Sequence, residues 1–229
     1  MATCLSGKTQ GSPPSRRSMM SAIGTHGPTV SPAVMLLLNV ALFSVAVWLL
    51  VKPQYKNETW LWPLLMFVGL AAGGRVALGF IPNVMPVTIM ALLVGSKFGA
   101  QRGIAFVILV TLLSNAVLGH GWWSLFQILG WGSVAVVASG IRVHDDENRL
   151  SMNRLTVASL WSVPIFSIIV SLSIIDSGMT VTGFGIYLIN GVLFDVLHVL
   201  GNVFFAMWFG QWFDRLLDMN QPQQHLVQE

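Results

Sequence analysis

The sequence predicts an all-α protein whose helices form a bundle in a lipid bilayer. Hydrophobic residues make up 54% of its 229 residues and charged residues only 9%, and the mean hydropathy is +0.71. Between Glu58 and Arg142 the charged residues are Arg75, Lys97 and Arg102 alone. A water-soluble domain of this size would expose far more charge. At about 20 residues per span, we expect a multi-pass membrane protein with roughly six or seven crossings.

Seven apolar stretches, separated by Gly, Pro or charged residues, are the predicted helices. They cover residues 32–51, 60–80, 86–98, 103–118, 124–141, 155–175 and 185–213. The stretch 86–98 is too short to cross a bilayer alone, so it is extended by its flanks, tilted, or only partly crossing. The preceding turn, Pro82 to Pro86, has an irregular backbone whose peptide groups cannot form hydrogen bonds with lipid. We therefore expect it to be buried in protein beside a cavity.

Composition divides the chain into four parts. Residues 1–30 are rich in Ser, Gly, Pro and Thr, which predicts a disordered N-terminal tail. An additional N-terminal transmembrane helix occupies 31–52, the main membrane domain 60–216, and a polar C-terminal tail 217–229. The single cysteine, Cys4, lies in the first tail, so one chain can form neither a disulfide framework nor a cysteine metal site.

The basic residues predict the orientation of the helices in the membrane. They fall in alternate connections, at Lys52, Lys56, Lys97, Arg102, Arg142, Arg149, Arg154 and Arg215. The intervening loops at 81–85, 119–123 and 176–184 carry no Lys or Arg. The positive-inside rule makes the basic side cytoplasmic, with the C-terminus inside and, for seven spans, the N-terminus outside. This distribution explains the pI of about 9.4 without a nucleic-acid partner.

The basic residues of the N-terminal tail oppose this orientation. Lys8, Arg16 and Arg17 would lie outside if residues 32–51 cross the membrane. Either the first stretch does not span, or translation starts at Met19 or Met20 and the basic tail is absent. We retain the span, because its apolar run exceeds the roughly 7 to 15 residues of a signal-peptide core.

Arg75 lies inside the second apolar stretch, where an unpaired guanidinium costs at least about 2.5 to 3.5 kcal/mol. The comparable acid is Asp195 in the last stretch, with His198 and Asn202 on the same helical face. We expect Arg75 to pair with Asp195, as a structural lock or as part of a ligand site. Asp195 and His198 also resemble a proton relay, but such pairs are more often satisfied interhelical hydrogen bonds, so no catalytic residue is assigned.

Two further patterns stand out. Gly69, Gly73 and Ala77 recur every four residues and form a groove for another helix; spacing favours packing within this chain over a separate partner. The segment from Asn115 to Gln127 combines hydrogen-bonding groups, glycines and tryptophans, which favours a binding loop over a simple aromatic belt. The residues that form this pattern, together with the preceding Ser114, are Asn115, Gly119, His120, Gly121, Trp122, Trp123 and Gln127.

Common sequence motifs for catalysis and metal binding are absent from the sequence. The sequence lacks His-Glu-x-x-His, Gly-x-Ser-x-Gly and a complete phosphate loop of the form Gly-x-x-x-x-Gly-Lys-Ser/Thr. The run from His144 to Glu147 predicts a solvated loop, because successive loop residues rarely converge on a metal. We expect neither enzyme activity nor a cofactor, and an ATP-driven process would need its ATPase from another chain.

The order of the polar motifs resembles the substrate-binding S components of energy-coupling factor (ECF) vitamin transporters, closest to the predicted cobalamin branch. The resemblance covers about residues 60–215. It rests on Arg75-Val-Ala-Leu-Gly-Phe-Ile-Pro-Asn-Val-Met-Pro-Val-Thr88, Ser114-Asn115, Gly119-x-Gly-Trp-x-x-x-x-Gln127-x-x-x-Trp131-Gly132 and Phe194-Asp-Val-Leu-His-Val-Leu-Gly-Asn202.

The resemblance implies a six-helix core in the cell membrane that holds a vitamin near its outer face. The helix at 60–80 would contact a separate T component, driven by two ATPase subunits, through Gly69, Gly73 and Ala77. The residues at 32–51 are additional to that core. The implied substrate-binding residues are Arg75, Asn83, Thr88, Asn115, His120, Trp122, Trp123, Gln127, Asp195 and His198. The alternatives are a structural scaffold without a ligand and, less favoured, an intramembrane enzyme using Asp195 and His198.

Overall fold

The computed structural model describes residues 30–51, 60–145, 147–175 and 179–219. Within these ranges the protein is all-helical and has no strand, which confirms the predicted fold class; His144 and Leu150 form one isolated bridge. The predicted N-terminal tail and most of the C-terminal tail lie outside the described residues. So do Cys4, the alternative start sites, and the basic residues Lys8, Arg16, Arg17, Lys52 and Lys56.

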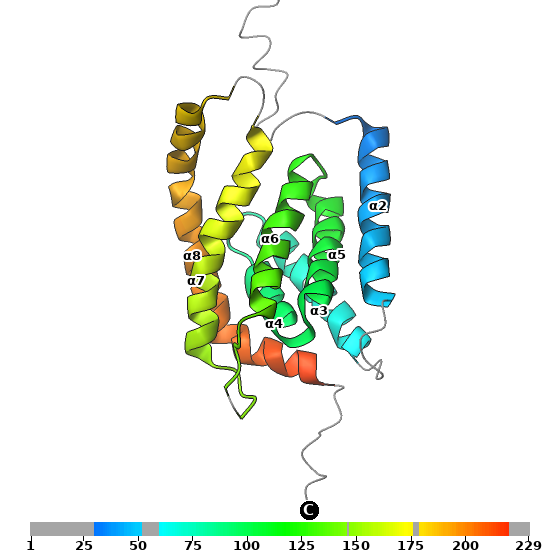
Figure 1. Ribbon diagram of the computed structural model, residues 1–229, viewed down its shortest axis with the longest axis vertical. Helices are drawn as coiled ribbons and strands as arrows, with labels where there is room; N and C mark the ends of the chain where they lie inside the picture. The colour runs from blue at the N-terminus through cyan, green and yellow to red at the C-terminus, as the bar shows by residue number, and fades with distance from the viewer. Residues whose placement is uncertain (1–29, 52–59, 146, 176–178, 220–229) are drawn as a thin grey trace, which may run out of the picture.

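Each of the seven predicted stretches corresponds to a helix in the described ranges (Figure 1). The helices are α2 Pro32–Val51, α3 Leu61–Ala77, α4 Val87–Phe98, α5 Ala100–Leu118, α6 Trp123–Ser139, α7 Met152–Ser171, extended by the 3-10 helix η2 Leu172–Ile174, and α8 Val181–Asp218. Only Gly99, with φ of 84°, separates α4 from α5. The largest difference from the prediction is the length of α8. This helix has 38 residues because it extends beyond both ends of the predicted stretch 185–213.

Four helices are long and apolar enough to cross a membrane: α2, α5, α7 with η2, and α8. Large apolar side chains face outward on these helices, including Trp161 at 70% exposure and Trp208 at 76%. Such a surface is unfavourable in water, and together with the span lengths it indicates a membrane protein. At 1.5 Å per residue α8 is about 57 Å long, more than the roughly 30 Å hydrocarbon core, and its C-terminal part turns across one end of the bundle (Figure 1).

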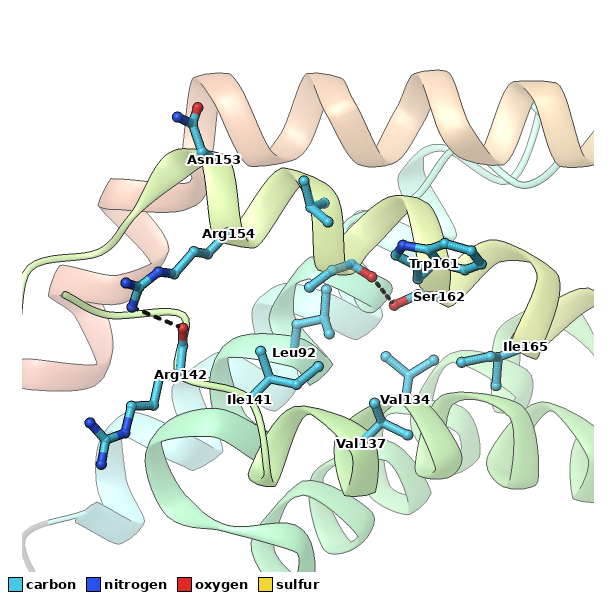
Figure 2. Close-up of a pocket in the computed structure, with 12 residues that line it drawn as sticks. Leu92, Val134, Val137, Ile141, Arg142, Asn153, Arg154, Trp161, Ser162 and Ile165 are labelled. Atoms are coloured by element: carbon cyan, nitrogen blue, oxygen red, sulfur yellow. Dashed lines mark hydrogen bonds between the residues drawn. The ribbon is translucent and has the colours of Figure 1, made fainter.

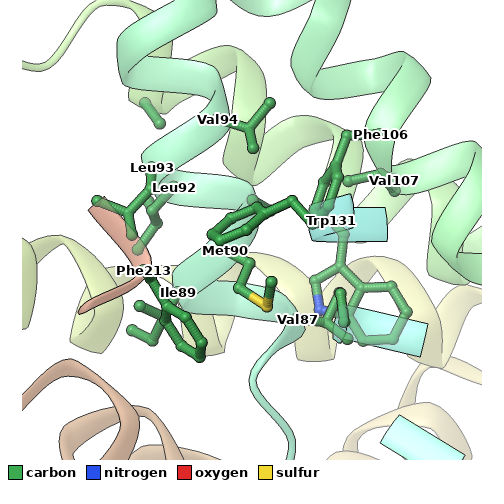
Figure 3. Close-up of a cluster of buried hydrophobic side chains, with 14 of the residues drawn as sticks. Val87, Ile89, Met90, Leu92, Leu93, Val94, Phe106, Val107, Trp131 and Phe213 are labelled. Atoms are coloured by element: carbon green, nitrogen blue, oxygen red, sulfur yellow. The ribbon is translucent and has the colours of Figure 1, made fainter. Parts of the chain in front are cut away.

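The hydrophobic core is built around α4. Ten of its twelve residues are buried, and α3, α5, α6, α7 and α8 all contact it. Figure 3 shows Met90 of α4 among the large side chains of neighbouring helices, including Phe106, Trp131 and Phe213. At about 18 Å, α4 is shorter than the hydrocarbon core. Protein replaces lipid around it, and which of the three expected arrangements α4 takes in a bilayer stays a prediction.

The turn before α4 packs against α8, as far as the prediction of burial goes: Pro82 is exposed, Pro86 is buried and the residues between them are half-buried. Its backbone approaches α8 closely: a Cβ placed on Gly201 would lie 3.2 Å from the Cα of Val84. Asn83 has a φ of 60° and its Nδ2 donates a hydrogen bond to the carbonyl oxygen of Phe194 at 3.3 Å. The irregular peptide groups are therefore placed against protein, where polar partners are present.

The basic residues gather at one end of the bundle, here called the basic end. The alternating course of the helices brings the α4–α5 and α6–α7 connections and the end of α8 to this end (Figure 1). It holds Lys97, Arg102, Arg142, Arg149, Arg154 and Arg215. The α5–α6 loop and the start of α2 lie at the opposite end. The predicted clustering of the described positive charges is thus confirmed.

An ion-pair cluster at the basic end joins three parts of the chain. Lys97 Nζ lies 3.0 Å from Asp214 Oδ1 and 2.7 Å from Asp218 Oδ2. His144 Nε2 lies 3.0 Å from the same oxygen of Asp214. These contacts tie the end of α4 and the α6–α7 connection to α8. We call Lys97, His144, Asp214 and Asp218 the basic-end cluster.

Candidate functional site

Arg75 is the centre of a buried group of polar side chains in the half of the bundle nearer the opposite end. It lies in the last turn of α3 and is 6% exposed. Its Nη1 donates hydrogen bonds to Oγ of Ser114 and, at 2.7 Å, to Oδ1 of Asn115. The guanidinium carbon lies 5.2 Å from the centre of the Trp131 ring. Its Nε has no hydrogen-bond partner in the structure.

Asn115 extends these contacts from α5 to α6. While its Oδ1 accepts from Arg75, its Nδ2 donates to Oγ of Ser124 at 2.8 Å and to Oε1 of Gln127 at 3.1 Å. Asn115 is 1% exposed, whereas Gln127 is half-buried. The structure therefore brings three of the predicted site residues, Arg75, Asn115 and Gln127, into one set of hydrogen bonds.

The α5–α6 loop closes over this set. Gly121 packs directly against the ring of Trp123, where a Cβ would lie 1.9 Å from a ring carbon, so only glycine fits this position. The Gly121 N–H donates to Ser124 Oγ at 3.3 Å. Trp122 makes an edge contact with Phe126, with ring centres 5.6 Å apart. Both tryptophans are half-buried and belong to the packing of the loop.

His120 lies in the same loop, outside the helices. Its Nδ1 is buried without a hydrogen-bond partner in the structure. Burial favours the neutral imidazole and lowers its pKa below the usual 6.5. His120 therefore offers an unoccupied polar atom close in sequence to Ser124 and Gln127.

A second set of contacts runs through α4, α6 and α8. His198 Nε2 and Thr88 Oγ1 are 2.9 Å apart, and Nε1 of Trp131 donates to the same hydroxyl at 3.3 Å. Phe166 stacks on Trp131 at 4.7 Å between ring centres and meets the His198 ring edge-on at 5.2 Å. All of these side chains are buried. Because Trp131 also contacts Arg75, the two sets are continuous.

We call this continuous assembly the polar network. It consists of Arg75, Thr88, Ser114, Asn115, Ser124, Gln127, Trp131 and His198. Ser124 was missed because a serine in the first turn of a helix carries no signal of its own. Trp131 was noted only as part of a motif, and its nine-residue separation from Trp122 gave no indication that it faces inward.

The predicted pairing of Arg75 with Asp195 is wrong in the structure. Asp195 instead accepts a hydrogen bond from Ser167 Oγ at 3.0 Å and is half-buried. Although Asp195 and His198 are three residues apart on α8, Asp195 faces α7 and His198 faces α4. A shared helical face did not determine which neighbouring helix each side chain meets. Asn202, one turn further on, donates to the Ser159 carbonyl at 3.2 Å.

Gly69 and Gly73 point out of the bundle. Both are exposed, and a Cβ placed on either would meet no atom within 4 Å. They line a groove of about 460 Å³ between α3 and the end of α8 that includes Trp212 and Leu216. Ala77 on the same helix is also exposed. Packing within the chain, which the spacing favoured, is therefore wrong for these residues.

The loop that follows α6 has the ion pairs of a solvated segment. Arg149 Nε lies 3.2 Å from Asp145 Oδ2, and its Nη2 lies 2.9 Å from Glu147 Oε2. Hydrogen bonding, first of all from the Arg149 backbone, lowers the pKa of Asp145. In the described part of the chain no three His, Cys, Asp or Glu side chains converge as metal ligands would.

The chemical groups of the polar network determine which solutes it could contact. It presents one cation, several amide and hydroxyl groups and an aromatic face, and the Arg75 charge meets no carboxylate among the described residues. Such a set can bind hydrogen-bond acceptors or an anionic group.

Comparisons with known proteins identify a family without assigning a function. Searches of curated proteins and of solved structures gave no match. Residues 54–222, well over half of the chain, match the model of one protein family. The matched range begins after α2 and includes all of α3 to α8. The chain therefore belongs to DUF6580, a family of unknown function.

Proposed function

We propose that the protein is the substrate-capture subunit of an ECF-type ABC transporter. It binds a vitamin or related micronutrient on the side of the membrane away from the basic end. A separate T component and two ATPase subunits power the uptake. By the positive-inside rule, the basic end and the C-terminus are cytoplasmic and the protein resides in the cell membrane.

The observation that carries this proposal is the buried Arg75 charge held by neutral groups. Ser114 and Asn115 supply its hydrogen bonds, and its Nε is left unpaired. A charge buried in a membrane protein for structure alone is normally compensated by an opposite charge, because the desolvation penalty is several kcal/mol. An acceptor group on a bound solute would supply that compensation and complete the hydrogen bonding.

The position of the network supports the same conclusion. Arg75, Asn115 and Gln127 all lie near helix ends that face the opposite end, beneath a loop that holds His120 and Trp122. A solute entering from that side would meet the half-buried loop first and Arg75 last. The motif order of the ECF vitamin S components adds the substrate class, with a cobalamin-type compound as the first candidate.

Ligand binding by the isolated chain tests the proposal. The purified protein in detergent is titrated with a panel of vitamins, and binding is followed by thermal unfolding and calorimetry. We expect one vitamin to raise the unfolding temperature, and Gln127→Ala or Trp122→Ala to weaken its binding while the protein stays folded. Trp161→Ala is the matched control, since Trp161 is an exposed tryptophan of α7 and is not a member of the polar network. No response to any vitamin, or unchanged affinity in both network variants, would reject the site.

The groove of Gly69 and Gly73 is the proposed contact for the T component. Helices approach closely where small residues line an open surface. Gly73→Leu should abolish co-purification with the T and ATPase subunits and abolish uptake, yet leave vitamin binding by the isolated chain intact. Gly191→Leu in α8 is the control, because a Cβ there also meets no atom within 4 Å. Retained assembly in Gly73→Leu would remove this contact.

The intramembrane enzyme is the weaker alternative. Its two residues have separate partners, with Asp195 bonded to Ser167 and His198 to Thr88. The structure thus offers no direct proton path between them. Substrate turnover by the isolated chain, abolished in Asp195→Asn, would support this alternative over capture.

A further inference from the structure

A second cavity lies at the basic end, between α6 and α7, and shares no residue with the polar network. Its volume is about 620 Å³. Its floor is Leu92 of α4, and its walls are apolar side chains of the two helices (Figure 2). The walls consist of Val134, Val137 and Ile141 on one side and Val157, Ala158, Trp161 and Ile165 on the other. We call this cavity the α6–α7 groove.

Two arginines and an asparagine mark the end of the groove that faces the basic end. Arg142 follows α6, while Asn153 and Arg154 lie in the first turn of α7. Nη1 of Arg154 donates to the carbonyl oxygen of His144 at 2.7 Å and to that of Arg142 at 3.5 Å. These bonds tie the Arg154 side chain to the main chain of the α6–α7 connection, while the Arg142 side chain extends away from it (Figure 2).

The charges of these two arginines are not balanced within the described residues. Neither forms an ion pair with a described carboxylate, whereas Arg149 in the same connection pairs with both Asp145 and Glu147. Two exposed arginines that line the mouth of one apolar groove attract an anion. The structure therefore combines a positively charged mouth with an apolar interior.

The length of the groove matches one leaflet of a bilayer. From Arg154 to Ile165 along α7 is about 16 Å, and half of the roughly 30 Å hydrocarbon core is about 15 Å. The groove thus begins at the interface, where a lipid phosphate lies, and ends near the middle of the membrane. A partner helix would instead be expected to contact α6 and α7 over a full span.

We propose that the α6–α7 groove binds one anionic phospholipid from the leaflet at the basic end. Its phosphate contacts Arg142 and Arg154, Asn153 hydrogen-bonds the headgroup, and an acyl chain lies along Trp161 and Ile165. Basic pockets between transmembrane helices bind anionic headgroups in this way. The proposal does not depend on the proposed transport function, because no vitamin or partner subunit takes part.

The test uses the full-length protein, delipidated in detergent, with phosphatidylglycerol or phosphatidylcholine added. Native mass spectrometry counts bound lipids, and thermal unfolding follows stabilisation. Each basic residue near an anionic lipid contributes a factor of roughly five, so phosphatidylglycerol should bind on the order of 30-fold more tightly than phosphatidylcholine. One tightly bound phosphatidylglycerol is expected per chain.

Variants separate the groove from general attraction to anionic lipid. Arg142→Gln with Arg154→Gln should remove the preference for phosphatidylglycerol, while Arg149→Gln, a neighbouring arginine outside the groove, should retain it. Val137→Trp fills the groove without changing charge and should displace the bound lipid. Equal binding of the two lipids, or an unchanged preference in the double variant, would overturn the proposal. A dimer that forms without lipid and is lost in Val137→Trp would show that a second protein chain occupies the groove instead.

Discussion

Arg75 and Lys97 are both cations enclosed by the helix bundle, but their surroundings differ. The Lys97 side chain is 10% exposed and contacts Asp214 and Asp218. Arg75 is 6% exposed, and its described hydrogen bonds go to a serine and an asparagine. Lys97 therefore lies in a site with carboxylates of the protein beside it, whereas Arg75 lies in a site that remains positive.

This difference is the basis for proposing a structural role for one site and a binding role for the other. The basic-end cluster joins α4 to the end of α8 through contacts between opposite charges of the protein itself. In the polar network a guanidinium is desolvated with no counter-charge from the protein. The free-energy cost of this desolvation must be offset by another interaction. Burial of a charge in a membrane bundle is thus less informative about function than the identity of its partners.

The largest expected effect is on stability at the basic end. Lys97→Met leaves Asp214 enclosed with only His144 beside it, and should lower the free energy of unfolding by about 3 kcal/mol. Lys97→Met combined with Asp214→Leu should recover part of this loss, since no buried charge then lacks a partner. Unfolding in detergent measures both variants. A loss below about 1 kcal/mol for Lys97→Met would place the cluster among weak surface ion pairs.

Arg75→Gln should give the reverse pattern. The free protein should change in unfolding free energy by less than about 1 kcal/mol, because removal of an uncompensated buried cation offsets the lost hydrogen bonds. Vitamin binding should weaken tenfold or more, since a hydrogen bond to a charged group contributes about 1.5 to 3 kcal/mol. Calorimetry and detergent unfolding check the two parts separately. A stability loss comparable to that of Lys97→Met would make Arg75 a structural residue.

A double-mutant cycle sharpens the assignment of partners. Arg75→Gln and Asp195→Asn should have additive effects on unfolding, with a coupling below about 0.5 kcal/mol, because the two side chains bond to different residues. A parallel cycle between Lys97 and Asp214 should show a clear coupling. Similar coupling in both cycles would contradict the distinction between the two sites.

The smallest expected effect concerns pH. The pKa of His120 is lowered in the folded protein, so below the unfolded value of about 6.5 the unfolded chain binds more protons than the folded one. Stability should therefore be full above pH 6.5 and decrease as the pH falls from there towards the folded pKa. His120→Gln should reduce this slope when unfolding is measured between pH 7 and pH 5. An unchanged slope would exclude His120 as its source.

Hydropathy predicted every described helix because each apolar stretch ends at a glycine, proline or charged residue that interrupts burial in lipid. It did not predict that α4 is enclosed by five other helices, because a helix buried in protein and a helix buried in lipid have the same apolar composition. Residue type and depth identified Arg75, Asn115 and Gln127 as site residues, because polar groups buried in a membrane form hydrogen bonds with one another.

Partners distant in sequence were beyond the reach of these patterns. Lys97 served only as a marker of orientation, because nothing local links it to Asp214 in the last helix. Asp195 was matched with Arg75 because both are isolated charges, although rotation about the α8 axis directs Asp195 towards α7. The sequence also could not predict that Gly69 and Gly73 face outward. A spacing of four residues places them on one face of the helix but does not show whether that face is directed into or out of the bundle.

The enclosure of α4 also constrains how the protein enters the membrane during synthesis. With ten of its twelve residues covered by other helices, α4 has almost no surface of its own to offer to lipid. It is joined to α5 by the single residue Gly99, so the two helices form a hairpin that can leave the translocon together. Helices α6, α7 and α8, which complete the cover of α4, are synthesised later. The central helix therefore reaches its final environment only after the last span has been inserted.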